Sequence, residues 1–526
     1  MGTAAIPSPH GAGAHDGDEH EHEHGHSHHH GPAPEVTPAG WTDGKRYAWL
    51  LGLIVPVSPF IAWGLVEATG LGVLWWLGPI LIFAVMPVLD TVIGTDAENP
   101  PDRILAWLEQ DRYYRWVTYA YVPLQYASLV LACVLWASGD LGVVEAIGLA
   151  VTVGCVSGFA INAAHELGHK RDAAEKWLSK VALAQTGYGH FFVEHNRGHH
   201  VRVATPEDPA SSRLGQSFWA FLPRTVWGSA TSSWHLERDR FRRLGATPWT
   251  LRNDLLNAWG MTVVGFVLLV AVFGPGIAPY LVLQAVVGFS LLEVVNYLEH
   301  YGLVRQRKDD GRYERTRPEH SWNSNNVASN VFLFHLQRHS DHHAHPTRRY
   351  QALRHFEEAP QLPSGYATMI LLALFPPVWR RVMDHRVLAH YGGDVTRANI
   401  HPRRREHVLR AYGPGTPAAE EGARVFAARE AADELARREA EAEAAAAARQ
   451  AEVVADAYSC PICDYVYAVA AGDPRNGVPA GTPWSGVPDD WHCPECGVRD
   501  KADFAPVVPR EGEPALAGRA SGEQDG

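Results

Sequence analysis

The sequence has no apolar segment near its start: residues 1–40 are polar, so no cleavable signal peptide is expected. It also has no excess of positive charge, because 46 Lys and Arg stand against 58 Asp and Glu and leave a net charge of −12. That balance argues against nucleic acid as the main partner. No G-x-G-x-x-G segment of a βαβ unit appears, so a dinucleotide-binding domain is not expected in this chain.

Cysteine is scarce, with six in 526 residues. Cys133 and Cys155 lie inside apolar runs, and the other four form two C-x-x-C pairs, Cys460 with Cys463 and Cys493 with Cys496. This pattern is typical of a metal site and not of a disulfide framework, which suits a reducing cytoplasm for the C-terminal part. Four thiolates predict one tetrahedral ion, and so small a domain needs such an ion because its own core is marginal.

Long apolar runs are abundant, although the mean hydropathy of −0.17 hides them by averaging an apolar middle with polar ends. Six runs approach the ~20 residues that cross a bilayer as a helix, at 47–67, 71–93, 118–137, 141–162, 255–273 and 277–298. The connections after the first, third and fifth runs carry no Lys or Arg, and the segments at the opposite ends carry many. By the positive-inside rule, both termini are expected in the cytoplasm; a large soluble helical protein would not show this alternation. A shorter stretch at 366–378 contains two prolines and predicts an interfacial or re-entrant segment.

Composition divides the chain further. Nine histidines mixed with Asp, Glu and Gly make residues 1–40 a predicted disordered tail, which either buffers divalent metal or has no specific role. The expected membrane domain covers 41–412. An Ala/Glu/Arg-rich run at 413–456 predicts a solvated helical linker. Residues 457–507 are expected to form a small domain with four cysteines, and 508–526 a second disordered tail.

Nine further histidines gather in the segments that follow the fourth and sixth apolar runs: His165, His169, His195, His199, His200, His300, His339, His342 and His343. Many are spaced by three or four residues, which puts side chains on one helix face. Imidazole suits zinc, copper, iron and nickel, but one catalytic zinc uses only three protein ligands, so nine candidates favour two ions. Acidic and amide groups that could support them are Glu166, Glu194, Glu299, Asp341, Glu293 and Asn296.

Two other readings remain open from the residues alone. His165-Glu166-Leu167-Gly168-His169 is a literal H-E-x-x-H, in which Glu166 would be the general base of an intramembrane zinc protease. That reading leaves five histidines and the four cysteines unexplained. The other reading is a metal-handling membrane protein supplied by the histidine-rich tail.

The histidine segments resemble those of the membrane-bound alkane 1-monooxygenases, which are related to fatty-acid desaturases and xylene monooxygenases. The shared motifs begin at His165, Glu194, Asn296 and Leu336, and the resemblance covers about 41–412. It implies a mainly α fold of six transmembrane helices, with cytoplasmic helical segments that carry the metal site. It also implies a non-haem di-iron centre bound by the nine histidines.

Residues 457–507 resemble a rubredoxin. The four cysteines are accompanied by Tyr465, Tyr467, Trp484, Trp491 and Phe504 at the aromatic-core positions of that family. Asp464 departs from the usual glycine after the first C-x-x-C, at a position that tends to need φ > 0, whereas Gly497 is kept. The resemblance implies a small β-rich domain with one iron held by the four cysteines.

Together the two resemblances imply terminal hydroxylation of n-alkanes to primary alcohols, with O₂ and two electrons from the fused rubredoxin. They imply an inner-membrane enzyme in contact with lipid and alkane, with both termini and the active site on the cytoplasmic side. A separate NAD(P)H-dependent flavin rubredoxin reductase would then reduce the rubredoxin.

Overall fold

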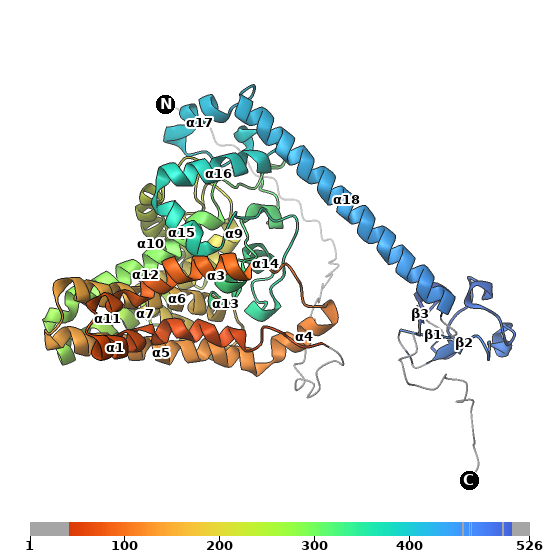
Figure 1. Ribbon diagram of the computed structural model, residues 1–526, viewed down its shortest axis with the longest axis horizontal. Helices are drawn as coiled ribbons and strands as arrows, with labels where there is room; N and C mark the ends of the chain where they lie inside the picture. Colours follow the sequence, from red (N-terminus) through yellow and green to blue (C-terminus); the bar gives the residue numbers. More distant parts are fainter. Residues whose placement is uncertain (1–40, 455–456, 462, 464, 497–498, 508–526) are drawn as a thin grey trace, which may run out of the picture. The chain divides into compact units, whose positions relative to one another are not determined.

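The structure is a computed structural model that describes residues 41–454, 457–461, 463, 465–496 and 499–507 (Figure 1). The expected tails at 1–40 and 508–526, and the positions Asp464 and Gly497, lie outside the described residues. The chain divides into two compact units, Met1–Val387 with Thr396–Ala411 and Leu388–Val395 with Tyr412–Gly526.

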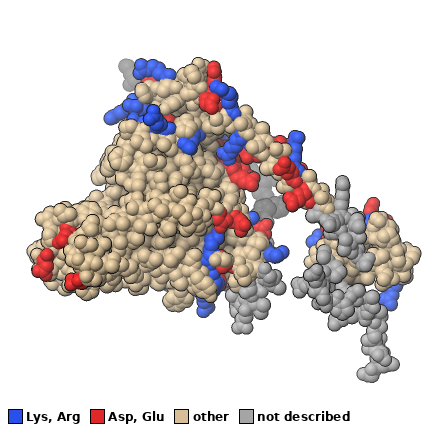
Figure 2. All heavy atoms as spheres, in the orientation of Figure 1, with Lys and Arg blue, Asp and Glu red and all other residues tan. Residues whose placement is uncertain are grey.

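The first unit contains six helical segments long and apolar enough to cross a membrane: Ala48–Thr69, Gly72–Ile93, Arg112–Ser138, Val143–Gly168, Asp254–Phe273 and Pro275–Glu299. They confirm the six predicted spans. On the face drawn in Figure 2, the flank of this bundle is almost free of charged side chains, and Lys, Arg, Asp and Glu lie toward its ends. The chain is therefore a multi-pass membrane protein.

The spans are built from several elements: η1 (Ala48–Leu53) and α1 (Ile54–Thr69); η2 (Gly72–Trp76), α2 (Leu77–Ile80), η3 (Leu81–Val85) and α3 (Met86–Ile93); α5 (Arg112–Ser138); α6 (Val143–Gly168); α11 (Asp254–Phe273); and η5 (Pro275–Ile277) with α12 (Ala278–Glu299). The segments between and after them form α4 (Asp102–Gln110), α7 (Ala173–Ala184), α8 (His190–Glu194), η4 (His195–His199), α9 (His200–Arg202), α10 (Phe218–Arg243), α13 (Val327–Phe332), α14 (His339–Ala344), α15 (Tyr366–Leu374), α16 (Pro376–His390) and α17 (Arg405–Tyr412).

Helices α6 and α12 pack closely because α6 carries glycine where the two meet. A Cβ on Gly154 would lie 2.5 Å from the Cβ of Val287, and one on Gly158 would lie 3.0 Å from that of Leu291. Glycines four residues apart let membrane helices approach in this way. The contact matters for function because both helices end among the clustered histidines.

The stretch expected at the membrane interface, 366–378, is broken into two helices. Helix α15 has nine residues and ends before Pro376, where α16 begins. Its buried side chains include Tyr366, Met369 and Ile370. It is too short to span a bilayer.

The second unit contains α18 (Pro417–Val454) and a three-stranded antiparallel sheet in the order β2-β1-β3. Its strands are β1 (Ala457–Ser459), β2 (Val466–Ala468) and β3 (Ala505–Pro506), and Tyr458 pairs with both Tyr467 and Pro506. Most described side chains of α18 beyond Phe426 are exposed, as a solvated helix requires. The aromatic side chains expected for a rubredoxin pack together over this sheet.

Candidate metal centres

The nine histidines come from four places in the fold. Helix α6 ends with His165 and is capped by His169, and His300 caps α12. The short η4–α9 segment carries His195, His199 and His200, and α14 carries His339, His342 and His343. All nine converge at the end of the bundle where α6 and α12 stop.

They converge as two groups. Within each group, one ring nitrogen of every histidine lies within 4.8 Å of one from each other member. The first group has five members: His165, His169, His195, His200 and His342. The second has four: His199, His300, His339 and His343. The groups adjoin, since the ring centroids of His200 and His343 are 4.6 Å apart. The sequence predicted the convergence and a division of the nine histidines into four and five, but not which histidine joins which group.

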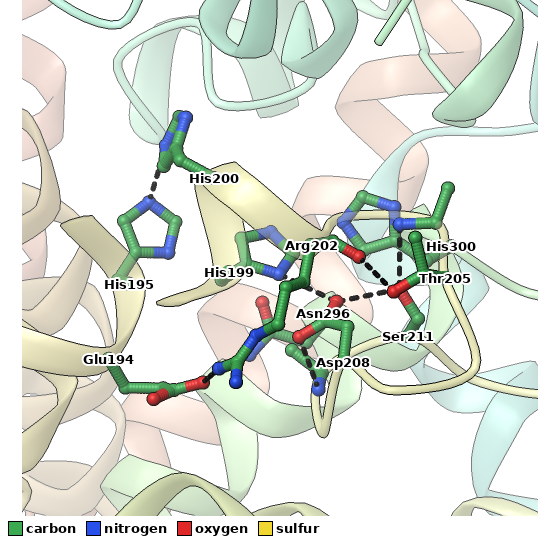
Figure 3. Close-up of polar contacts among 12 residues, drawn as sticks. Glu194, His195, His199, His200, Arg202, Thr205, Asp208, Ser211, Asn296 and His300 are labelled. Atoms are coloured by element: carbon green, nitrogen blue, oxygen red, sulfur yellow. Dashed lines mark hydrogen bonds and ion pairs between the residues drawn. The ribbon is translucent and has the colours of Figure 1, made fainter. Parts of the chain in front are cut away.

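A π-helical turn explains how neighbouring histidines serve different groups. Residues His195–His199 form η4, whose i→i+5 hydrogen-bond pattern brings residue i+5 back over residue i. His200 therefore faces His195, with their Nε2 atoms 3.1 Å apart (Figure 3), and His199 is turned toward the other group.

The spacing of the ring nitrogens suits ligands of a shared metal ion better than a hydrogen-bond network. His200 Nε2 lies 3.1 Å from His195 Nε2 and 3.0 Å from His342 Nε2, and His342 Nε2 is also 2.8 Å from His165 Nε2. One imidazole proton cannot satisfy so many facing nitrogens. Imidazoles bound about 2.0–2.1 Å from a shared ion would stand about 3–4 Å apart, which these separations approach.

The second group has the same character. His339 Nε2 is 2.8 Å from His343 Nε2 and 3.2 Å from His300 Nε2. His199 Nε2, like His169 Nε2 in the first group, is buried and has no hydrogen-bond partner among the described residues. Buried polar atoms left unpaired in this way fit a bound metal ion, which the residues present can therefore hold.

Burial favours the neutral form of His195, His200, His300 and His339, and neutral imidazole is the form that binds metal. Burial lowers the pKa of His300 to about 3 and the pKa values of His195, His200 and His339 well below their ordinary value. Neighbouring imidazoles add to the effect.

Asp208 is a supporting residue that sequence reasoning missed. Its carboxylate accepts hydrogen bonds from His199 Nδ1 at 2.9 Å and from Ser211 Oγ at 2.6 Å (Figure 3). Burial would raise the pKa of Asp208, but His199 and these hydrogen bonds lower it to about 2. Asp208 lies in a loop between two prolines, where no periodic pattern signals it.

Among the six supporting residues expected from the sequence, Glu299 lies beside a ligand candidate: its carboxylate is 3.3 Å from His339 Nδ1 and accepts a hydrogen bond from Tyr366 at 2.9 Å. Glu166 instead pairs with Lys170 Nζ at 3.0 Å. The structure gives the others these partners: Glu194 with Arg202, Asp341 with Arg348, and Glu293 with Tyr188, Thr225 and Asn296.

An apolar cavity of about 40 Å³ lies between the spans next to the histidines. Its wall includes Asn162, three residues before His165, and Leu336, three residues before His339. Asn162 donates its side-chain amide to the carbonyl of Leu333 at 2.6 Å, so this polar group is already satisfied. The other lining side chains are apolar, so the cavity suits an apolar ligand.

The second unit has its own metal-type site. The sulfur atoms of Cys460, Cys463, Cys493 and Cys496 lie within 4.8 Å of one another. Cys460 Sγ is 3.8 Å from Cys496 Sγ, and Cys463 Sγ is 3.5 Å from Cys493 Sγ. Four sulfurs bound tetrahedrally at about 2.3 Å would be separated by about 3.8 Å, so the cluster fits one such ion.

Two family models match the chain. One described as fatty acid desaturase matches residues 142–373, and one described as rubredoxin matches residues 457–504. The fold and the two kinds of site thus define a class: a multi-pass membrane protein with metal-binding histidine clusters and a fused rubredoxin domain.

Comparison with individual proteins gives the family. The chain is 48% identical over 391 residues to the alkane 1-monooxygenase of Acinetobacter baylyi, covering 72% of this chain and 94% of that protein. It is 45% identical over 382 residues to alkane 1-monooxygenase 1 of Alcanivorax borkumensis, covering 73% and 95%. A more distant relative is the xylene/toluene monooxygenase hydroxylase component XylM of Pseudomonas putida, at 27% over 215 residues, 41% of this chain and 57% of that protein. The chain belongs to the alkane 1-monooxygenase family.

Proposed function

We propose that this chain hydroxylates the terminal methyl group of n-alkanes to give primary alcohols. The balanced reaction converts RCH₃, O₂, two electrons and two protons into RCH₂OH and water. The observation that carries the proposal is the pair of histidine groups, of five and four members, beside an apolar cavity. The relatives named as alkane 1-monooxygenases support the substrate and the reaction.

The cofactors are two non-haem iron ions in the membrane domain and one iron in the rubredoxin domain. His165, His169, His195, His200 and His342 would hold one ion, and His199, His300, His339 and His343 the other. Bound iron supplies the activation of O₂ in the membrane domain and one-electron transfer at the four cysteines. Asp208 and Glu299 would orient His199 and His339.

The apolar cavity positions the substrate by excluding water. Its volume is several times the 10–15 Å³ that one water needs, so it suits the reacting end of a chain more than a whole alkane. Side chains of Phe159, Leu292 and Ile370 line it. A dry wall of this kind also limits side reactions of the activated oxygen.

The rubredoxin domain delivers the two electrons one at a time, so it must be reduced twice in each turnover. We assign the membrane domain to 41–412, the linker to 413–456 and the rubredoxin domain to 457–507. Because no dinucleotide-binding motif appears in the chain, a separate NAD(P)H-dependent flavin rubredoxin reductase is the expected donor. The distribution of Lys and Arg supports an inner-membrane location with both termini and the active site facing the cytoplasm.

The test is product analysis of the purified full chain with a series of n-alkanes, O₂, a rubredoxin reductase and its nicotinamide. We expect primary alcohols and about two irons in the membrane domain with a third at the cysteines, as the ligand sets imply. One zinc per chain and no alcohol would refute the proposal.

A matched pair of histidine variants sharpens the test. His339→Ala removes a candidate ligand and should abolish hydroxylation while leaving the cysteine-bound iron in place. His235→Ala removes an exposed histidine of α10 outside both groups and should keep full activity. Full turnover by the His339→Ala variant would show that His339 is not an iron ligand.

A further inference from the structure

A second, much larger cavity borders the histidines, and His169 is part of its wall. It measures about 690 Å³ and is lined by the end of α6, the start of α7, η4 and the segment that enters α11. Its wall carries six cationic side chains, Lys170, Arg171, Lys176, Lys180, Arg197 and Arg252, and one carboxylate, Asp254. None of these six side chains has a role in the hydroxylation proposed above.

Three of the six cations have carboxylate partners. Lys170 pairs with Glu166 at 3.0 Å, Lys180 pairs with Asp254 at 2.7 Å, and Arg197 pairs with Glu237 and Asp254. The other three, Arg171, Lys176 and Arg252, are exposed and form no ion pair with the described residues. They are available to an anion from outside the chain.

The cavity lies at the level where helices leave the membrane. Gly168, the last residue of the fourth span, and Asp254, the first of the fifth, both line it. Trp177 and Leu251 line it too and are 49% and 84% exposed. Tryptophan and basic side chains together are typical of the depth at which lipid headgroups lie.

Helix α11, whose start forms part of the cavity wall, carries exposed apolar side chains along its length. Only 11% of the most apolar window of this span is buried. Val263, Val264 and Val267 on it are each about 60% exposed. A free phosphate ion would use the cationic mouth alone, whereas a phospholipid would use both the mouth and this flank.

We propose that this cavity binds the phosphate headgroup of an anionic phospholipid, whose acyl chains lie along α11. Arg171, Lys176 and Arg252 supply the charge-assisted contacts to the headgroup, since each basic group near a membrane surface attracts anionic lipid. The inference concerns membrane binding beside the fourth span and does not depend on the hydroxylation reaction.

The test measures lipid retained by the full chain, purified in neutral detergent, using native mass spectrometry at graded lipid concentrations. The probes are dioctanoyl phosphatidylglycerol, dioctanoyl phosphatidylcholine and inorganic phosphate as a competitor. We expect phosphatidylglycerol to bind at least about tenfold more tightly than phosphatidylcholine. Combining Arg171→Gln, Lys176→Gln and Arg252→Gln should weaken its binding by about tenfold or more.

The control combines Arg315→Gln, Arg403→Gln and Arg405→Gln, which remove the same charge from exposed positions outside the cavity and should leave binding unchanged. Equal binding of both lipids, equal loss in both triple variants, or displacement by equimolar phosphate would overturn the proposal. If the cavity triple variant binds lipid normally but receives electrons more slowly, the cavity binds an acidic protein surface. That result would also overturn the lipid proposal. If the triple variant unfolds, Lys176→Gln alone should still weaken binding several-fold, and no change would count against the site.

Discussion

A single carboxylate outside the histidine motifs fixes one ligand candidate. Asp208 holds His199 through Nδ1, which leaves His199 Nε2 to face the metal site. Loss of a hydrogen bond to a metal-binding histidine commonly costs about 10–100-fold in metal affinity or activity. We therefore expect Asp208→Asn to lose iron from the membrane domain at about 10–100-fold lower chelator concentration than the unsubstituted chain, with the cysteine-bound iron unchanged.

The neighbouring Glu207→Gln is the control for that measurement. Glu207 is exposed and contacts Arg307 and Tyr313 at the surface, away from His199. It should retain iron normally. If both variants lose iron equally, the loop as a whole and not the Asp208 carboxylate would be responsible.

At the residue scale, the sequence could predict which histidines come together and that they form groups of four and five, but not which histidine belongs to which group. Spacing of i and i+4 associates His195 with His199, yet the π-helical turn puts His195 with His200 and sends His199 to the other group. The extra residue in that turn results from i→i+5 backbone hydrogen bonds, which the residue types do not reveal. Asp208 could not be predicted as the partner of His199 because it lies in a loop, where residue spacing does not indicate which side chains meet.

At the scale of elements, the spans were predictable because a bilayer imposes length and apolar composition together. The ends of the spans were less predictable from apolar composition. The apolar residues of the fourth run stop at 162, whereas α6 continues to Gly168 and carries His165, which was expected to extend this span. Helical hydrogen bonding persists where the hydropathy falls, so an apolar run underestimates the helix.

The contact between α6 and α12 gives a prediction at this scale. A leucine at Gly154 would overlap Val287, and overpacking of this kind typically costs about 1–3 kcal/mol. Gly154→Leu should therefore lower the midpoint of thermal unfolding of the membrane domain and reduce its iron content. Gly265→Leu places the same side chain on α11, where nothing lies within 4 Å, and should do neither. Equal destabilisation by both would mean that the close approach of the helices is not the cause.

The whole molecule joins two metal sites that can be separated by substitution. Cys496 Sγ lies 3.8 Å from Cys460 Sγ in the four-cysteine cluster. Cys496→Ser should stop electron delivery through the fused domain and leave the iron of the membrane domain in place, as measured by iron content and NAD(P)H-driven alcohol formation. Added free rubredoxin should restore the activity, and its failure to do so would contradict a modular arrangement. Cys133→Ser, which alters a buried thiol of α5, should need no such rescue.

The linker gives the last prediction. Helix α18 has 38 residues, about 57 Å at 1.5 Å per residue, and it is braced locally by pairs such as Arg438 with Glu434. A tether raises the effective concentration of its domain to about the millimolar range when short and less when long. With a protease site inserted after Ala440 and the reductase held at a fixed, saturating concentration, the turnover per chain should not change when the protein is diluted before cleavage. After cleavage, the turnover per chain should fall as the protein is diluted below micromolar concentration. The rubredoxin domain and the membrane domain are then separate molecules that must meet for electron transfer. Turnover that stays independent of dilution after cleavage would show that the rubredoxin domain binds the membrane domain tightly without the helix, and the fusion would then serve another purpose.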